Sequence, residues 1–214
     1  MPNIGICNPR AANSAPNSFS VARAMNHLTI PDAFKLTHEQ FQQLAMANRE
    51  YCLERSAAGE LIVMPPTGSI TSNQNLDIEG QLWLWNRQTQ LGKAFNSSGG
   101  YHLPNGADRS PDAAWVSLAR WNALTPDQQE GFAPLCPDFV VELRSPSDNL
   151  KSLQAKMQEY MENGTRLGFL IDRKTQQVEI YRPNAAPEIL IHPNRLSGED
   201  VLPGFVLDLT EVWR

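Results

Sequence analysis

Cysteine is scarce in this chain of 214 residues, and long hydrophobic runs are missing. An odd, widely spaced set of thiols (Cys7, Cys52 and Cys136) argues against a disulfide framework. No pair has the C-x-x-C spacing of a zinc ribbon or a redox motif. No apolar run approaches the ~20 residues of a membrane helix, and the N-terminus lacks the pattern of a signal peptide. We therefore expect a cytoplasmic protein with three ordinary thiols.

Basic charge is also in short supply. Lys and Arg total 18 against 23 Asp and Glu, which leaves a net charge of −5. Proteins that hold nucleic acid nonspecifically usually carry a basic surplus, so this balance counts against that class. It does not exclude DNA as a substrate, because carboxylates that bind a metal add local negative charge that the metal offsets.

Several common functional motifs are absent. The sequence has no nucleophile elbow, P-loop or dinucleotide fingerprint. The histidines are scattered, without the spacing of metal ligands: His27, His38, His102 and His192. Packing in a core or groove, rather than a base-stacking platform, is expected for three tryptophans: Trp83, Trp85 and Trp115.

Composition divides the chain into two parts. Residues 1–35 are rich in Asn, Ala, Ser and Pro and show no periodicity, which predicts an extended or partly disordered arm. Residues 36–214 are long enough for one domain with a substantial core.

The patterns along this domain alternate between helix and strand. A capping box of Thr37 and Gln40 begins the first helix. Helical spacing occurs in four segments: 38–50, 73–90, 117–131 and 150–163. Strand patterns occur at 51–55, 60–64, two or three places within 93–116, 139–143, 167–171, 177–181, 188–192 and 201–207. This order predicts an α/β (α+β) fold with a mixed central sheet flanked by helices.

Glu142 interrupts the apolar run Phe139–Leu143. Side chains alternate along a strand, so Glu142 shares a face with Val140. A carboxylate there is costly unless it is paired, hydrogen-bonded or bound to a metal. On spacing alone, an edge glutamate that faces water or an arginine is an equal alternative.

Lys156 lies in the helix that follows this strand. Leu153, Lys156, Met157 and Tyr160 share one helix face, which is otherwise apolar. A boundary lysine whose stem extends to water is the ordinary explanation. The functional alternative places the Lys156 ammonium beside the Glu142 carboxylate.

Asp112 opens the segment Asp112–Val116, on the face of Ala114. If this strand neighbours the one with Glu142, the two carboxylates converge, and they repel unless a cation or proton intervenes. Hard oxygen ligands suit Mg²⁺ or Mn²⁺, which activates a bound water and neutralises charge on a phosphate oxygen. Glu54 is a further candidate, although its position alone favours a surface glutamate.

Three blocks of sequence carry a family resemblance: LERSAAGELIVMPPTG, SPDAAWV and PDFVVELRSPSDNLKSLQAKMQEYMENGTRLGFLIDRKTQQVEIYRP. Through them, the segment from Thr37 to Leu207 resembles the restriction endonuclease family expanded in cyanobacteria, within the PD-(D/E)XK nuclease superfamily. The resemblance implies a nuclease-like fold, a mixed central sheet flanked by helices.

The resemblance also implies roles for individual residues. Asp112 and Glu142 would be the two motif carboxylates, Glu54 would complete the metal shell, and Lys156 would be the motif lysine, moved from the strand to the helix. The strict spacing places a lysine two residues after Glu142, where this chain has Arg144. Arginine stays charged and cannot act as a base. Lys156 is favoured, and Arg144 as an electrostatic substitute or a contact to carboxylate or phosphate stays open.

The sequence hypothesis is therefore a Mg²⁺-dependent endonuclease that acts on DNA phosphodiester bonds. One alternative is a nuclease fold that serves as a binding or regulatory module without turnover, since fold alone does not guarantee function. Another is a metal-dependent hydrolase of a different phosphoester. A homodimer would match the two-fold symmetry of duplex DNA, but nothing in the sequence establishes it.

Overall fold

A computed structural model describes residues 34–214, so the arm predicted for residues 1–35 lies almost wholly outside the described residues. A six-stranded mixed sheet forms the centre of the fold. Strands β7 and β8 pair in parallel and the other neighbours are antiparallel. The strands in spatial order are β10 (Glu188–Ile191), β9 (Gln177–Tyr181), β8 (Leu167–Asp172), β7 (Phe139–Arg144), β6 (Ala113–Ser117) and β3 (Gly92–Asn96).

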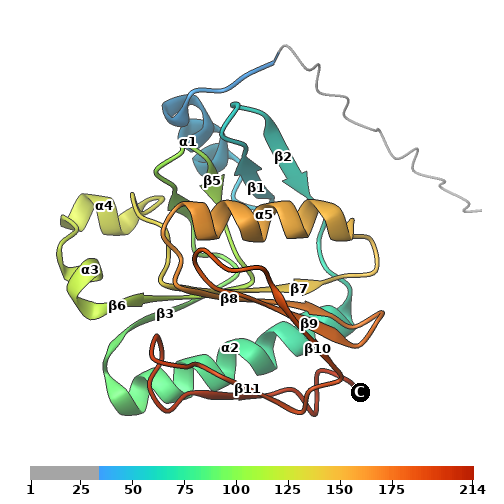
Figure 1. Cartoon of the computed structure of the whole chain (residues 1–214). Coiled ribbons are helices and arrows are strands. Elements are labelled where there is room, and N and C mark those ends of the chain that lie inside the picture. The colour runs from blue at the N-terminus through green and yellow to red at the C-terminus, as the bar shows by residue number, and fades with distance from the viewer. Residues whose placement is uncertain (1–33) are drawn as a thin grey trace, which may run out of the picture. The chain divides into compact units, whose positions relative to one another are not determined.

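Two helices cover opposite faces of this sheet, α5 (Leu150–Glu162) above and α2 (Ser69–Thr89) below in Figure 1. Strand alternation sorts the core into two clusters. Phe139 and Val141 pack in the cluster that contains buried residues of α2, whereas Val140 packs in the cluster that contains Met157 of α5. Glu142, in phase with Val140, therefore faces α5.

A second sheet of four short strands lies beside the α5 layer, next to α1 (His38–Ala47) (Figure 1). Its strands in order are β2 (Leu61–Met64), β1 (Cys52–Arg55), β5 (Asp108–Arg109) and β4 (Tyr101–His102). Arg55 lies opposite Asp108 in the β1–β5 pair. Because neighbours in a strand point to opposite faces, Arg55 and Asp108 project from one face and Glu54 and Arg109 from the other.

Smaller elements complete the described chain. A two-stranded ribbon packs against the α2 side through Leu196 and Leu207. The remaining elements are α3 (Leu118–Asn122), α4 (Pro126–Glu130), β11 (Arg195–Ser197) and β12 (Val206–Asp208). No helix within residues 34–214 combines the length and apolar character needed to cross a bilayer.

The predicted fold class, a mixed sheet flanked by helices, is confirmed. Boundaries differ where tertiary contacts outweigh local signals. The first helix has its predicted capping box but ends at Ala47, since Asn48 caps it. The second helix begins at Ser69 rather than residue 73, directly after its N-cap Gly68. Residues 92–117 hold four strands, β3, β4, β5 and β6, and β6 starts after Asp112. The two-residue strands β4 and β5 pair with each other, and β5 also pairs with the distant β1.

The tryptophans divide differently from the prediction. Trp85 and Trp115 are buried and contact each other edge-on, as expected for core residues. The expectation of core or groove packing was wrong for Trp83, which is 55% exposed with the Arg87 guanidinium over its ring. The two residues are separated by one helical turn, and the cation covers the ring on the solvent side.

Gly92 offers a test of how tightly β3 approaches β6. A Cβ at Gly92 would meet the backbone oxygen of Val116 and the ring of Trp115. We expect Gly92→Ala to lower the free energy of unfolding by about 1–3 kcal/mol, the usual cost of overpacking. Urea denaturation measures the change.

Gly80→Ala in α2 is the matched control. Nothing lies within 4 Å of a Cβ at Gly80, so alanine should leave stability unchanged or raise it by up to about 1 kcal/mol. Equal effects of the two substitutions would show that β3 can shift away from β6 without cost.

Candidate active site

The Lys156 ammonium lies at the centre of a buried charged cluster. Its Nζ is 2.8 Å from Glu54 Oε1 and 2.7 Å from Glu142 Oε1, and the Lys156 side chain is only 10% exposed. Met157 and Tyr160, fully buried on α5, set the helix rotation that turns Lys156 toward the sheet. Three distant segments, β1, β7 and α5, thus converge on one cation. The structure thus places the Lys156 ammonium beside the Glu142 carboxylate, as in the second of the two alternatives drawn from the sequence.

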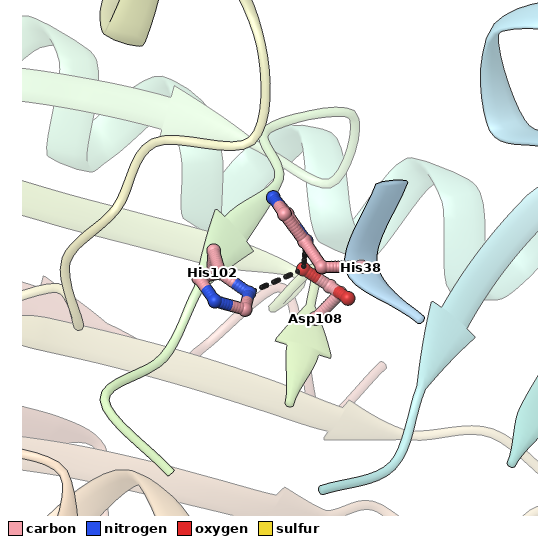
Figure 2. A group of neighbouring side chains, drawn as sticks. All are labelled: His38, His102 and Asp108. Carbon is pink, nitrogen blue, oxygen red and sulfur yellow. Dashed lines mark hydrogen bonds and ion pairs between the residues drawn. The ribbon is translucent and has the colours of Figure 1, made fainter. Parts of the chain in front are cut away.

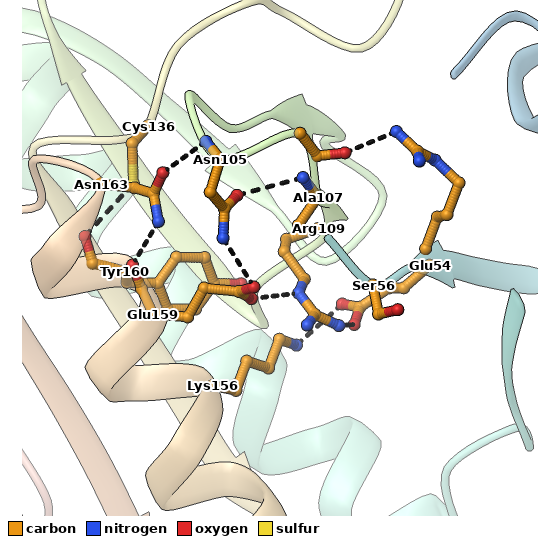
Figure 3. A network of polar contacts seen from close by, with 12 residues as sticks. Glu54, Ser56, Asn105, Ala107, Arg109, Cys136, Lys156, Glu159, Tyr160 and Asn163 are labelled. Atoms are coloured by element: carbon orange, nitrogen blue, oxygen red, sulfur yellow. Dashed lines mark hydrogen bonds and ion pairs between the residues drawn. The ribbon is translucent and has the colours of Figure 1, made fainter. Parts of the chain in front are cut away.

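Glu54 is held as an anion by several donors (Figure 3). Arg109 Nη1 lies 3.0 Å from its Oε2, and the Ser110 backbone N–H donates to Oε1. Burial alone would raise the pKa of Glu54, but the charges of Lys156 and Arg109 outweigh it and hold that pKa below its usual value. Glu54 is 2% exposed, so the surface position that its sequence context favoured is wrong.

Arg109 extends this network to α5. Its Nε lies 2.6 Å from Glu159 Oε2, and Asn105 Nδ2 donates to Oε1 of the same carboxylate. Figure 3 shows the guanidinium between Glu54 and Glu159, so one arginine joins β1, β5 and α5. Burial opposes the charge of Arg109, but the Glu54 and Glu159 carboxylates raise its pKa above the usual value.

Asp112 lies immediately before β6, where β7 and α2 approach. Its Oδ2 accepts a 2.7 Å hydrogen bond from the Leu143 backbone, and its Oδ1 accepts one of 3.2 Å from Asn75 Nδ2. Burial raises the pKa of Asp112, against the favourable hydrogen bond from Leu143 and the charge of Lys156. The carboxylate is thus fixed by the neighbouring strand and by α2.

Glu142 is the carboxylate of the group whose pKa is shifted furthest from its usual value. Tyr160 Oη donates to its Oε1 at 3.2 Å, beside Lys156. Burial raises the pKa of Glu142 to about 8; Lys156 opposes this shift, while the charges of Asp112 and Glu54 reinforce it. With Glu159, four carboxylates share two cations, Lys156 and Arg109, so the ionised cluster has a net charge of −2.

These residues fit a divalent metal ion. The cluster lacks two positive charges, and an additional oxygen is available at Asn75, whose buried Oδ1 has no hydrogen-bond partner among residues 34–214. Carboxylate and amide oxygens are the ligands that Mg²⁺ and Mn²⁺ prefer. Asp112 and Glu142 would hold such an ion, with Asn75 beside them.

A polar cleft of about 440 Å³ adjoins Asn75. It lies at the N-terminal end of α2, where Gly68 provides no side-chain cap and leaves backbone N–H groups free. Most lining side chains are hydroxyls or amides: Thr67, Ser69, Ser72, Asn73, Asn75 and Ser97, with Leu76 and Glu79. The cleft therefore offers neutral hydrogen-bond donors together with Glu79, and Asn75 joins it to Asp112.

Arg144 contacts a different carboxylate. Its Nη1 lies 2.7 Å from Asp172 Oδ2, and its Nε donates to the backbone oxygen of Asp148. Of the two cations considered from the sequence, Lys156 is the one that contacts Glu142. Arg144 instead ties β7 to β8 and to the turn before α5.

Sequence reasoning missed several residues of this region. Arg109 and Glu159 gave no local signal, because the strand that carries Arg109 is only two residues long. Asn75 did have one: it shares a helix face with Ile78 and Leu82, and an amide on an apolar face needs a polar partner.

The histidines also proved to be partly clustered. Although no sequence spacing suggested it, His38 and His102 both contact Asp108 (Figure 2). This cluster projects from the other face of the β1–β5 pair, away from Glu54 and Arg109.

Comparison with known proteins identifies the fold and the family. A crystal structure from Anabaena variabilis ATCC 29413, described as "a putative nuclease belonging to DUF820", has 19% sequence identity and a TM-score of 0.65; the match covers 77% of this chain and 90% of that chain. It supports a restriction-endonuclease-like fold. Residues 38–210 match the family model Uma2, described as "Putative restriction endonuclease". The chain belongs to this nuclease family. No curated protein sequence matches it significantly.

Stability should depend on pH through Glu142. Its folded pKa of about 8 exceeds the usual 4.5, so folding favours the protonated carboxyl. That stabilisation is present below the usual pKa and is lost as pH rises through the folded pKa. In EDTA, we expect the free energy of unfolding to fall between about pH 5 and about pH 8.5, and Glu142→Gln should reduce this slope. The exposed Glu50→Gln is the control, and an unchanged slope in Glu142→Gln would contradict the assignment.

Proposed function

We propose that this chain is an endonuclease, dependent on Mg²⁺ or Mn²⁺, that hydrolyses DNA phosphodiester bonds. One observation carries the proposal: the Lys156 ammonium lies 2.7 Å from Glu142 in a buried cluster with Asp112, in which carboxylates outnumber cations. A lysine and two carboxylates on one side of a mixed sheet are also what the family resemblance implies.

The carboxylates have distinct roles in this proposal. Asp112 and Glu142 would hold the metal ion, and Asn75 would orient Asp112 through its amide. Glu54, which the resemblance assigns to the metal shell, pairs with Lys156 and Arg109 and would position these two cations beside the site. When bound, the ion lowers the pKa of a coordinated water and neutralises charge on a phosphate oxygen.

Lys156 acts electrostatically. Burial disfavours its charge, but Glu142 and Glu54 outweigh burial and raise the pKa of Lys156 above its usual value. A lysine that stays protonated is not a base; it donates hydrogen bonds. Lys156 would orient the attacking water and balance charge on the phosphate oxygens. Water adds to phosphorus, the bond to the leaving sugar oxygen breaks, and the proton that the water releases to solvent is replaced by one that solvent gives to that oxygen.

The polar cleft at the start of α2 is the proposed path of the substrate strand. Ser, Thr and Asn side chains and helix N-termini are common contacts to DNA phosphates. Contacts of this kind do not need a basic surface, which is consistent with the net charge of −5. Asn75 joins the cleft to Asp112, so a strand bound there would bring a phosphate toward Asp112.

Plasmid cleavage is the direct test. Purified protein should nick supercoiled DNA in Mg²⁺ or Mn²⁺ but not in EDTA, at low salt because phosphate contacts weaken as salt rises. Asp112→Ala and Lys156→Ala should each lower the rate by about 10²-fold or more. Lys151→Ala, an exposed lysine on the same helix, should leave it unchanged.

The outcomes separate the candidate functions. If Lys156→Ala nicked DNA at the wild-type rate, Lys156 would not be the catalytic cation. Absence of nicking with hydrolysis of small phosphodiesters would indicate another phosphoesterase, and metal binding without any hydrolysis would indicate a binding or regulatory module.

Metal affinity gives a measurement that is independent of turnover. Calorimetric titration with Mn²⁺ should detect one site near Asp112, and Asp112→Asn should weaken binding by about 10-fold or more, because a charged oxygen ligand is lost. Asp172→Asn is the control, since Asp172 pairs with Arg144 outside the cluster. If Asp112→Asn bound Mn²⁺ as tightly as the wild type, the ion would bind at a site that does not include Asp112.

Two further features belong to the proposal. A homodimer would match the two-fold symmetry of duplex DNA and place one site on each strand. A cytoplasmic location, expected from the sequence, is the other.

A further inference from the structure

The face of the β1–β5 pair opposite Glu54 carries a compact cluster of nitrogen and oxygen donors. His38 is the first residue of α1, His102 lies in β4 and Asp108 in β5. The Nδ1 atoms of both histidines lie 2.8 Å from the same oxygen, Asp108 Oδ1. Figure 2 shows both rings directed at that carboxylate.

We propose that His38, His102 and Asp108 form a second metal site, specific for a divalent transition ion of the Zn²⁺ class. The three donor atoms lie within 4.8 Å of one another. Two imidazole nitrogens and one carboxylate oxygen suit Zn²⁺, Co²⁺ or Ni²⁺, whereas Mg²⁺ takes oxygen ligands. The site is thus chemically different from the all-oxygen cluster around Asp112.

The three donor atoms would need to move only slightly to bind an ion together. At the ~2.0–2.1 Å bonds of Zn²⁺ to nitrogen and oxygen, a 2.8 Å separation corresponds to an angle of about 85–90° at the ion. That angle suits an octahedral ion directly, and a slight opening of the rings reaches the tetrahedral angle. The histidine side chains are 24% and 28% exposed, so an ion can enter from solvent and water can complete its shell.

Contacts that do not need an ion already fix each ligand. Asp108 is fully buried, and Arg55 Nε holds its other oxygen at 2.6 Å. The backbone N–H of His102 donates to Ala133, and His38 follows the capping residue Thr37. Partners of this kind orient metal ligands and tune affinity.

Charge determines which ions the site would prefer. Arg55 already neutralises Asp108, so binding depends mainly on the imidazoles, each with its proton on Nε2 and its Nδ1 lone pair toward the ion. This favours ions with strong nitrogen affinity over Mn²⁺ and Mg²⁺.

The site is adjacent to the proposed active site through the strands that carry both. Arg55 and Asp108 are the immediate neighbours of Glu54 and Arg109, which pair with each other at 3.0 Å. An ion that ties α1 to β4 and β5 would therefore stabilise the strands that position Lys156. This last consequence rests on the proposed function, but the metal site itself does not.

Co²⁺ is a suitable probe, since its visible absorption reports coordination. The full chain would be titrated with Co²⁺ in excess Mg²⁺, which occupies oxygen-only sites, and Zn²⁺ would then displace the Co²⁺. We expect one site whose affinity falls by about 10-fold or more in His38→Gln and in His102→Gln, because each loses a nitrogen ligand. His192→Gln, an exposed histidine outside the cluster, and Asp112→Asn should bind as wild type does.

Several results would overturn the proposal. They are the absence of a Co²⁺ spectrum, a spectrum insensitive to both histidine substitutions, or one lost in Asp112→Asn. X-ray absorption of the wild-type Zn²⁺ complex tests the site without any variant that might misfold: two imidazole ligands are expected, and an oxygen-only shell would refute it. These results do not depend on plasmid nicking, so the metal site and the endonuclease activity can be refuted independently of each other.

Discussion

The buried ammonium of Lys156 is the interaction on which this arrangement depends. Glu54 and Glu142 are almost fully buried, and a lone carboxylate in such a place carries a large desolvation cost. One cation from α5 contacts both at once, which requires α5 to lie over β7 and beside β1. The position of the helix, the approach of the two sheets and the charge of the cluster are therefore coupled.

Carboxylates outnumber cations in this cluster, and the excess negative charge affects both protonation and metal binding. Burial, reinforced by the charges of Asp112 and Glu54, raises the pKa of Glu142 to about 8 although Lys156 opposes the shift, and Glu142 and Glu54 raise the pKa of Lys156 against its burial. A proton on Glu142 would offset one of the two excess negative charges, whereas a divalent ion would offset both. The acidic composition of the chain, with a net charge of −5, is consistent with a site that needs a cation before it can approach a phosphate.

The β1–β5 pair gives the fold two chemically different faces. Alternation along two very short strands directs Glu54 and Arg109 toward Lys156 and directs Arg55 and Asp108 toward His38 and His102. A shift of either strand would disturb both clusters together. Asp108 is fully buried, so a shift that broke its salt bridge with Arg55 would leave a buried charge unpaired and would be costly.

The sequence by itself determined what depends on local periodicity. Helical spacing placed Lys156 on the face with Met157 and Tyr160, alternation placed Glu142 in phase with Val140, and a capping box set the start of α1, and each of these matches the structure. Only the tertiary structure decided the burial of Glu54, the position of Arg109, and the meeting of His38 with His102. Those residues lie in short strands or at a helix start, and their partners are distant in the chain. Periodicity tells which residues share a face, but which faces meet depends on long-range strand pairing and on the burial of charge, and neither leaves a local pattern.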